Sequence, residues 1–141
     1  MISARTAPGL AAGSVDFVEQ KFGFTMPYSP ESLLVVDEIV DKIKATGATE
    51  QQASGLLSGL GCYVGEVYVR TARASWRPAA EMKMSRSCRF PAVLALPGMT
   101  GCDPIGVVFD RFNLGPAHSA ARLYEDAVWR PQKLVSSADG P

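Results

Sequence analysis

The fold is decided by residues 49–71, which read TEQQASGLLSGLGCYVGEVYVRT. The first four residues have the capping-box pattern, in which the Thr49 side chain accepts from the backbone N–H of Gln52 and the Gln52 side chain accepts from that of Thr49. Apolar side chains then recur at the three- and four-residue spacing of one helix face, at Leu56, Leu60, Tyr63, Val64, Val67 and Tyr68. These patterns predict one long helix over residues 49–71.

Glycine interrupts this helical pattern at positions 55, 59, 61 and 65. In an exposed helix each glycine costs about 1 kcal/mol relative to alanine, so helix propensity alone argues against the assignment. Glycines four residues apart lie on one face of a helix, and without side chains they let a neighbouring element approach closely. This helix is therefore predicted to be the central and most buried one, because it carries two such pairs, Gly55 with Gly59 and Gly61 with Gly65.

Further helices are predicted from capping residues, from proline in the first helical turn and from glycine or proline after the last. They cover residues 14–22, 30–46 and 104–113. A last helix is predicted from Ala117 or Ser119 to Trp129, and Pro131 follows as the residue that stops it.

Two stretches have strand patterns. The alternation of apolar and polar residues over 82–90 predicts an edge strand or hairpin, and the apolar run 92–96, between Pro91 and Pro97, predicts a buried strand. Residues 97–101 are typical of a turn.

Helices followed by strands and then helices are typical of an α+β domain. We expect N-terminal helices, the long central glycine-rich helix, a small antiparallel sheet of about three strands and C-terminal helices. A length of 141 residues suits one hydrophobic core. We therefore expect a single domain over residues 14–131, with a flexible N-terminal arm at 1–13 and a flexible C-terminal tail at 132–141.

Composition excludes several classes of protein. Apolar residues make up 47% and charged residues 20%, which is unlike a disordered or fibrous chain, and no apolar run approaches the length of a membrane-spanning helix. The 14 basic residues balance the 14 acidic ones, so net charge gives no attraction to nucleic acid or to an anionic membrane. Three cysteines are too few for a disulfide framework. We expect a soluble cytoplasmic protein without a cofactor.

Three segments follow one another as LGCYVGEVYVR at 60–70, PAVLALPG at 91–98 and DPIGVV at 103–108. With Trp76 between the first two, they resemble a family of small bacterial domains of uncharacterised activity. The shared pattern is L-G-x-Y-x-G-E-V-x-x-R, a nearby W, an apolar strand and D-P-[FI]-x-x-V, and Cys62 stands where the family has alanine. The resemblance covers residues 29–129 and implies a bacterial cytoplasmic α+β domain with no established activity.

Glu66 and Arg70 are four residues apart on the predicted central helix, with the acid first, which is the favourable order for an ion pair. If this helix is buried, Glu66 is desolvated, and Arg70 offsets part of that cost. We predict a structural pair that ties the helix to the strand bearing Trp76. The alternative is that Glu66 is a ligand or acid/base group, although no second carboxylate lies at helical spacing from it.

Cysteine and histidine offer two further candidate sites. Cys62, Cys88, Cys102 and His118 make a formal set of zinc ligands, but their separations of 26, 14 and 16 residues contain no short zinc-binding pair. We expect no metal site. A nucleophilic pair of one cysteine with His118 is the second candidate, against the common role of an isolated thiol as a small core residue.

Residues 70–89 carry a net charge of +5. The basic side chains are Arg70, Arg73, Arg77, Lys83, Arg86 and Arg89. Together with Trp76 they make a candidate surface for a phosphate, an acidic peptide or a nucleic-acid backbone. Aromatic residues for base stacking are limited to Trp76 and Phe90, and the alternative is a solvated strand face.

No motif of specific chemistry is present, and we predict a non-catalytic binding module. We expect another protein as its partner and no membrane contact; an anionic ligand and a homo-oligomer are open alternatives. Two other functions remain open. One is a small hydrolase or transferase that uses Glu66 with Arg70, or a cysteine with His118. The other is an anion or nucleic-acid binder that uses residues 70–89.

Overall fold

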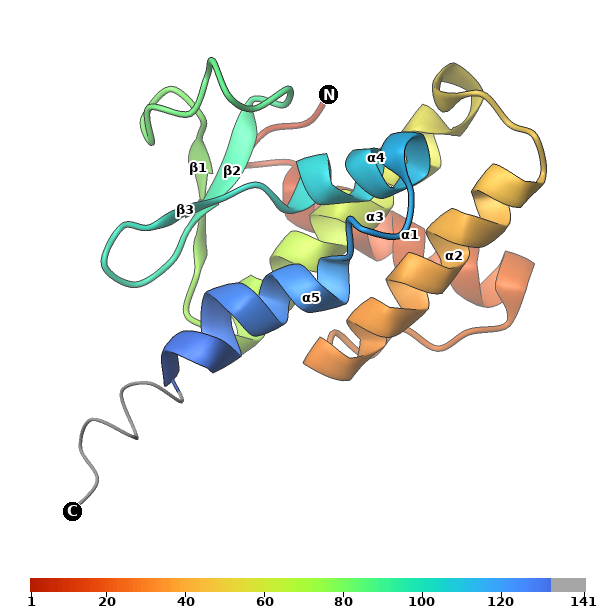
Figure 1. The fold of residues 1–141 in the computed structure, drawn as a ribbon, viewed down its shortest axis with the longest axis horizontal. Helices are drawn as coiled ribbons and strands as arrows, with labels where there is room; N and C mark the ends of the chain where they lie inside the picture. Colours follow the sequence, from red (N-terminus) through yellow and green to blue (C-terminus); the bar gives the residue numbers. More distant parts are fainter. Residues whose placement is uncertain (133–141) are drawn as a thin grey trace.

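The computed structural model describes residues 1–132 of the chain and shows an α+β fold (Figure 1). One long helix lies in the middle, other helices pack on both sides of it, and a small sheet lies to one side. The helices are α1 (Ala7–Phe22), α2 (Leu33–Ala45), α3 (Glu50–Thr71), α4 (Pro104–Leu114) and α5 (Ala120–Tyr124), with a 3₁₀ turn η1 (Pro30–Ser32) before α2 and a π-helical turn η2 (Glu125–Trp129) after α5. The strands are β1 (Ser75–Pro78), β2 (Ala92–Ala95) and β3 (Gly101–Cys102). The predicted fold class is confirmed.

The central helix α3 begins and ends where the sequence predicts. Both bonds of the capping box are present, at 3.1 Å from Gln52 N to Thr49 Oγ1 and 2.9 Å from Thr49 N to Gln52 Oε1. Every residue from Gly59 to Tyr68 is buried, and α1 and α4 pack against this helix. No helix within residues 1–132 combines the length and the hydropathy that crossing a bilayer requires.

Three glycines of α3 mark places where another element lies almost on the helix backbone. A Cβ atom added at Gly59 would come within 3.1 Å of α1, and one added at Gly61 within 2.7 Å of the backbone of α4. At Gly65 an added Cβ would overlap the indole ring of Trp76 on β1. Gly55 has no such neighbour within 4 Å, so the close approach predicted there is wrong. The other three glycines let α3 occupy the centre of the fold.

The N-terminal helix α1 begins at Ala7, well before the predicted start at Ser14. Two alanines of this stretch are fully buried, so residues 7–13 belong to the folded domain, and the flexible arm predicted for 1–13 is wrong for them. Pro8 suits the first helical turn, where an N–H has no partner within the helix. The alanines pack on α3, a contact between residues far apart in the sequence that no local pattern reveals.

The sheet is antiparallel, with strand order β1-β2-β3. Trp76 lies opposite Leu94, and Leu94 lies opposite Cys102. All four residues of β2 are buried, which confirms the strand predicted in this apolar run. The turn predicted at 97–101 joins β2 to β3, whose first residue is Gly101.

The strand or hairpin predicted over 82–90 is wrong, because this segment forms turns. Lys83 has a left-handed backbone conformation, with φ of 57°, which does not occur in a regular strand. The Ala79 N–H donates to the Pro91 carbonyl at 2.7 Å and closes the loop between β1 and β2. The first strand lies earlier in the chain, at β1.

Three predicted helix starts are confirmed by their capping bonds. Ser29 Oγ accepts from the Ser32 N–H at 3.3 Å and begins η1, which leads into α2. Asp103 Oδ1 accepts from the Gly106 N–H at 2.9 Å at the start of α4. Ser119 Oγ accepts from the Arg122 N–H at 3.1 Å at the start of α5.

The C-terminal helix does not stop at Pro131, because residues 130–132 are helical and follow the π-helical turn η2. Proline lacks the N–H for an α-helical bond, and its ring collides with the carbonyl four residues earlier. The wider turn η2 ends at Trp129, two residues before this proline, and it contains Ala127, whose carbonyl the ring would meet in a regular α-helix. Residues 133–141, most of the tail predicted at 132–141, lie outside the described residues.

Candidate ligand-binding groove

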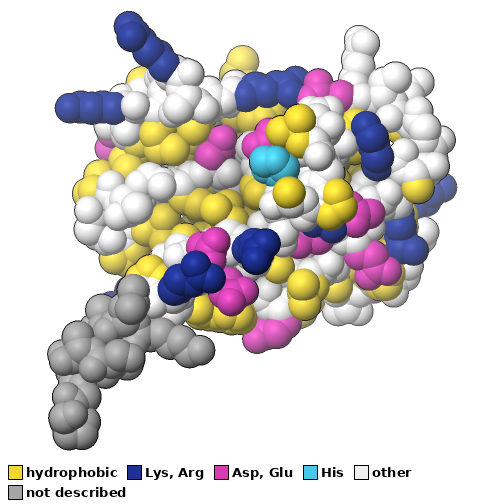
Figure 2. Space-filling view, in the orientation of Figure 1, with side chains coloured by type: hydrophobic (Ala, Val, Ile, Leu, Met, Phe, Trp, Pro, Cys, Tyr) yellow, Lys and Arg dark blue, Asp and Glu magenta, His cyan; other side chains and the backbone are white. Residues whose placement is uncertain are grey.

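A groove of about 810 Å³ lies between the β2–β3 turn, the first half of α4 and the C-terminal helix. Its apolar wall includes Leu96, Val107, Leu123, Ala127 and Val128, and its polar side chains include Thr100, Cys102, Asp103, Asp110, His118 and Asp126. Figure 2 shows this face hollowed, with hydrophobic side chains inside it and acidic side chains beside them; the one histidine, His118, lies at its edge. The π-helical turn η2 supplies three lining residues, and π turns are frequent at functional sites.

The carboxylates of the groove differ in their partners. Asp126 pairs with Arg130 at 3.0 Å, whereas no ion pair within residues 1–132 includes Asp103 or Asp110. Burial raises the pKa of Asp103 above its ordinary value, and the charge of Asp110 raises it further, although the Gly106 N–H opposes the shift. The groove thus holds two acidic groups without a basic partner from the described chain.

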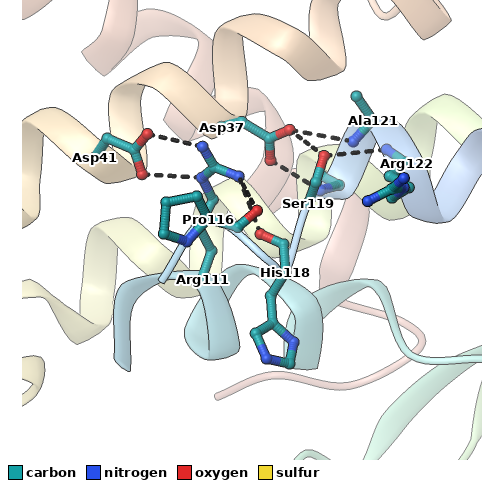
Figure 3. Close-up of polar contacts among 9 residues, drawn as sticks. Asp37, Asp41, Arg111, Pro116, His118, Ser119, Ala121 and Arg122 are labelled. Atoms are coloured by element: carbon teal, nitrogen blue, oxygen red, sulfur yellow. Dashed lines mark hydrogen bonds and ion pairs between the residues drawn. The ribbon is translucent and has the colours of Figure 1, made fainter. Parts of the chain in front are cut away.

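A polar network fixes the wall that carries His118 (Figure 3). Asp37 of α2 accepts from Ser119 Oγ at 2.6 Å and from the Ala120 N–H at 2.8 Å, at the start of α5. Arg111 of α4 donates to both carboxylate oxygens of Asp41, at 2.9 and 2.7 Å, and to the His118 carbonyl at 3.1 Å. The imidazole ring of His118 points away from this network. These bonds join α2, α4 and α5, and nothing in the sequence pattern predicts them.

Cys102 and His118, proposed from sequence as one possible nucleophilic pair, line the same groove but form no hydrogen bond with each other. Burial raises the pKa of the Cys102 thiol to about 12, so the reactive thiolate is scarce at neutral pH. Burial raises the pKa of Cys62, on α3, to about 12 as well. In the described part of the chain, no cluster of three or more His, Cys, Asp or Glu residues could hold a metal ion.

Tyr68 of α3 carries a buried hydroxyl that makes no hydrogen bond of regular geometry with the described residues, although the Cys102 thiol is close enough for a weak one. The Cys102 thiol and the Asp126 carboxylate, both part of the groove, lie close enough to influence it electrostatically. Burial is the main reason that the pKa of Tyr68 is raised. Its ring meets that of Tyr124 edge-on, with centroids 4.9 Å apart. A buried hydroxyl with a thiol as its polar neighbour therefore lies behind the groove wall.

Glu66, Arg70 and Trp76, which the sequence links, do meet in the structure, but outside the groove. Trp76 Nε1 donates to Glu66 Oε2 at 3.0 Å, and an Arg70 guanidinium nitrogen lies 3.7 Å from Glu66 Oε1. Glu66 is 6% exposed, and Arg70 stacks 3.5 Å from the ring centroid of Tyr28. This is the geometry expected for a structural tie between α3 and β1.

The basic residues predicted to form one patch are divided by ion pairs. Arg77 pairs with Glu81 at 3.1 Å, and Arg89 pairs with Glu50 at the start of α3. With Arg70 beside Glu66, half of the six basic side chains contact a carboxylate. Arg73, Lys83 and Arg86 are exposed, without an ion pair inside residues 1–132. The positive charge of residues 70–89 is therefore partly neutralised, and the single basic surface that the sequence predicts is not formed by all six side chains.

Comparisons of the chain with models of protein families, with curated proteins and with solved structures gave no match. The resemblance of residues 29–129 to a bacterial domain family stays a prediction. Function is therefore inferred from the geometry of the described residues.

The acids of the groove were missed at the level of sequence. The sequence indicates Asp103 only as the cap of the helix predicted over 104–113, and Asp110 only as a residue within that helix. The available signal was their spacing, since residues seven apart on a helix share a face. That spacing indicates a shared face, but not that a turn and a second helix would enclose it.

Proposed function

We propose that the protein is a non-catalytic binding domain and that the groove is its ligand site. The observation that carries this proposal is a cavity of about 810 Å³ with a mostly apolar wall and a few converging polar groups. Ligand pockets commonly have volumes of about 300–1,000 Å³ and this kind of lining. Such a cavity suits a small molecule with an apolar body.

The chemistry of the candidate catalytic groups supports binding rather than catalysis. The thiol of Cys102 is protonated at neutral pH and has no base hydrogen-bonded to it, whereas a catalytic cysteine needs both activation and a base. Glu66 is buried beside Trp76, away from the groove, where no substrate reaches it. The prediction of a protein partner stays a prediction, and the divided basic surface gives nucleic-acid binding little support.

Filling the groove tests this proposal. Val107 lines the groove and is only partly buried, so Val107→Trp places a large ring in the cavity. Ala127 also lines the groove, and Ala127→Leu fills the cavity with a smaller side chain. A mixture of 1-hexanol, cyclohexanol and phenol should shift the backbone amide NMR signals of groove residues in the wild type. Both filling variants should weaken these shifts while keeping a native-like spectrum elsewhere.

Ala12→Trp is the matched control, because Ala12 is an exposed residue of α1 away from the groove. It should bind the three probes as the wild type does. Probes that shift no groove signal, or that shift them equally in the filled variants, would show that this cavity is not the ligand site.

A further inference from the structure

The acidic groups of the groove are held in place before any ligand arrives. Asp103 Oδ1 is fixed by the Gly106 N–H at 2.9 Å, and the carboxylate lies against Gly106, where an added Cβ would overlap Oδ2. The Cys88 thiol lies near enough to this carboxylate to lower its pKa slightly, against the effect of burial. A charge that is already fixed and partly desolvated binds an opposite charge with little further ordering.

Asp110 follows on the same helix and lines the same groove as Asp103. The two carboxylates repel each other, and neither has a lysine or arginine partner in the described chain. Elsewhere the molecule does supply such partners, as for Asp41 with Arg111 and Glu50 with Arg89. Among residues 1–132, no lysine or arginine therefore neutralises the two acids of the groove.

The rest of the wall determines what kind of cation fits. Leu96, Val107, Leu123 and Val128 present apolar surface to the cavity. A bare metal ion would leave this surface in contact with water, and the acids have no third ligating side chain grouped with them within residues 1–132. An organic cation covers the apolar wall and pairs with the acids at the same time.

We infer that the groove binds a small organic amine, with its ammonium group beside Asp103 and Asp110 and its apolar body against the wall formed by Val107, Leu123 and Val128. This inference rests on the proposed function, because it names the class of ligand for that same site. An anionic ligand is disfavoured by the same two carboxylates.

Three probes of equal chain length separate charge from apolar contact. Hexylammonium, 1-hexanol and hexanoate are titrated into the protein at neutral pH, and binding is followed by amide NMR shifts of groove residues. Hexylammonium should bind about tenfold more tightly than 1-hexanol, the difference expected from one favourable charge-assisted contact. Hexanoate should bind more weakly than either.

Two variants, each of which removes one negative charge, test whether Asp103 and Asp110 cause the preference for hexylammonium over 1-hexanol. Asp103→Asn keeps the helix cap, because asparagine caps as well as aspartate, and Asp110→Asn changes an exposed side chain. Each should reduce the preference for hexylammonium over 1-hexanol several-fold, with the larger loss of affinity for hexylammonium. Asp16→Asn, at an exposed acid of α1, is the control and should retain the full preference.

The outcomes distinguish the two proposals. If 1-hexanol and hexylammonium bind equally, or both aspartate variants keep the full preference, the groove is a ligand site but not an amine site. If none of the three probes shifts groove signals, the proposed function fails as well. If a capped peptide, acetyl-Leu-Lys-Leu-amide, shifts groove signals and hexylammonium does not, the small-amine inference is overturned in favour of a protein partner.

Discussion

Glu66 and Asp103 are two acids in partly apolar surroundings, and their partners differ. Glu66 accepts from Trp76 Nε1 and lies near Arg70, so the chain itself stabilises its carboxylate. Asp103 caps its own helix, but no basic side chain of the described residues pairs with it. Burial alone therefore does not mark a functional acid. An acid that the fold leaves without a counter-charge is the better candidate for a ligand contact.

The largest expected effect is on stability, from a change in the contact between Gly65 and Trp76 beside Glu66. Gly65→Ala should lower the free energy of unfolding by about 1–3 kcal/mol, because the new Cβ overlaps the rigid indole of Trp76. Urea denaturation measures this change. The control is Gly55→Ala, which places a methyl group in open space on the same helix and should raise stability by up to about 1 kcal/mol. Equal effects at the two glycines would remove the packing explanation.

The same contrast can be tested on the acids themselves. Glu66→Gln should cost about 1 kcal/mol, because a charge-assisted hydrogen bond with Trp76 becomes a neutral one. Asp103→Asn should be neutral or slightly stabilising, since it removes a desolvated charge that no basic side chain of residues 1–132 pairs with, and it keeps the cap. Both values come from urea denaturation at neutral pH. A larger loss at Asp103 than at Glu66 would reverse our distinction between the two acids.

The pH dependence of Asp103 gives a smaller effect. The folded protein holds the Asp103 proton more tightly than the unfolded chain, because burial raises its pKa. Ionisation of this group therefore reduces stability as pH rises from the unfolded pKa through the folded one. A bound ammonium group stabilises the ionised form, so hexylammonium should lower the pKa of Asp103, and its binding should weaken as pH falls through that range.

Carboxyl ¹³C NMR titration of Asp103, with and without hexylammonium, measures this shift. Asp110, Asp126 and His118 also face the groove, and Asp103→Asn separates their contribution. An Asp103 signal that titrates identically with and without the amine would contradict the proposed contact.

The smallest expected effect is at the surface, where Glu50 is paired. Hydrogen bonds from Arg89 and Asn113 lower the pKa of Glu50 to about 2, so its contribution to stability is present above its unfolded pKa and is lost as pH falls toward 2. Arg89→Gln should move this pKa up toward its ordinary value with only a slight change in melting temperature. Lys83→Gln, at an exposed residue without an ion pair in residues 1–132, should leave it unchanged.

The sequence predicts the structure correctly where the residues that determine it lie within one helical turn. The capping box at Thr49, the serine cap at Ser29 and the aspartate cap at Asp103 act within one helical turn, and each is present as predicted. Sequence reasoning failed for residues 7–13, whose helix is held by contacts with α3, and for residues 82–90, where alternation of side chains coincides with turns.

The candidate sites divide in the same way, into contacts that local sequence signals predict and contacts that only the fold creates. The meeting of Glu66, Arg70 and Trp76 could be predicted, because helical spacing and a nearby tryptophan indicate it. The groove could not, because its walls come from the β2–β3 turn, α4 and the C-terminal helix, which only the fold brings together. The identity of Asp110 as a groove residue depends on that assembly and not on its neighbours in the sequence.

The π-helical turn η2 links the shape of the groove wall to Pro131. A π turn contains one residue more than the corresponding α-helical segment, and η2 brings Asp126, Ala127 and Val128 to the groove. Pro131→Ala would supply the missing N–H and remove the ring that collides with the carbonyl four residues earlier, so this segment would no longer be kept from regular α-helical bonding. A single substitution near the end of the described chain would thus alter the groove wall, while α3 and the capped start of α5 keep their sequence.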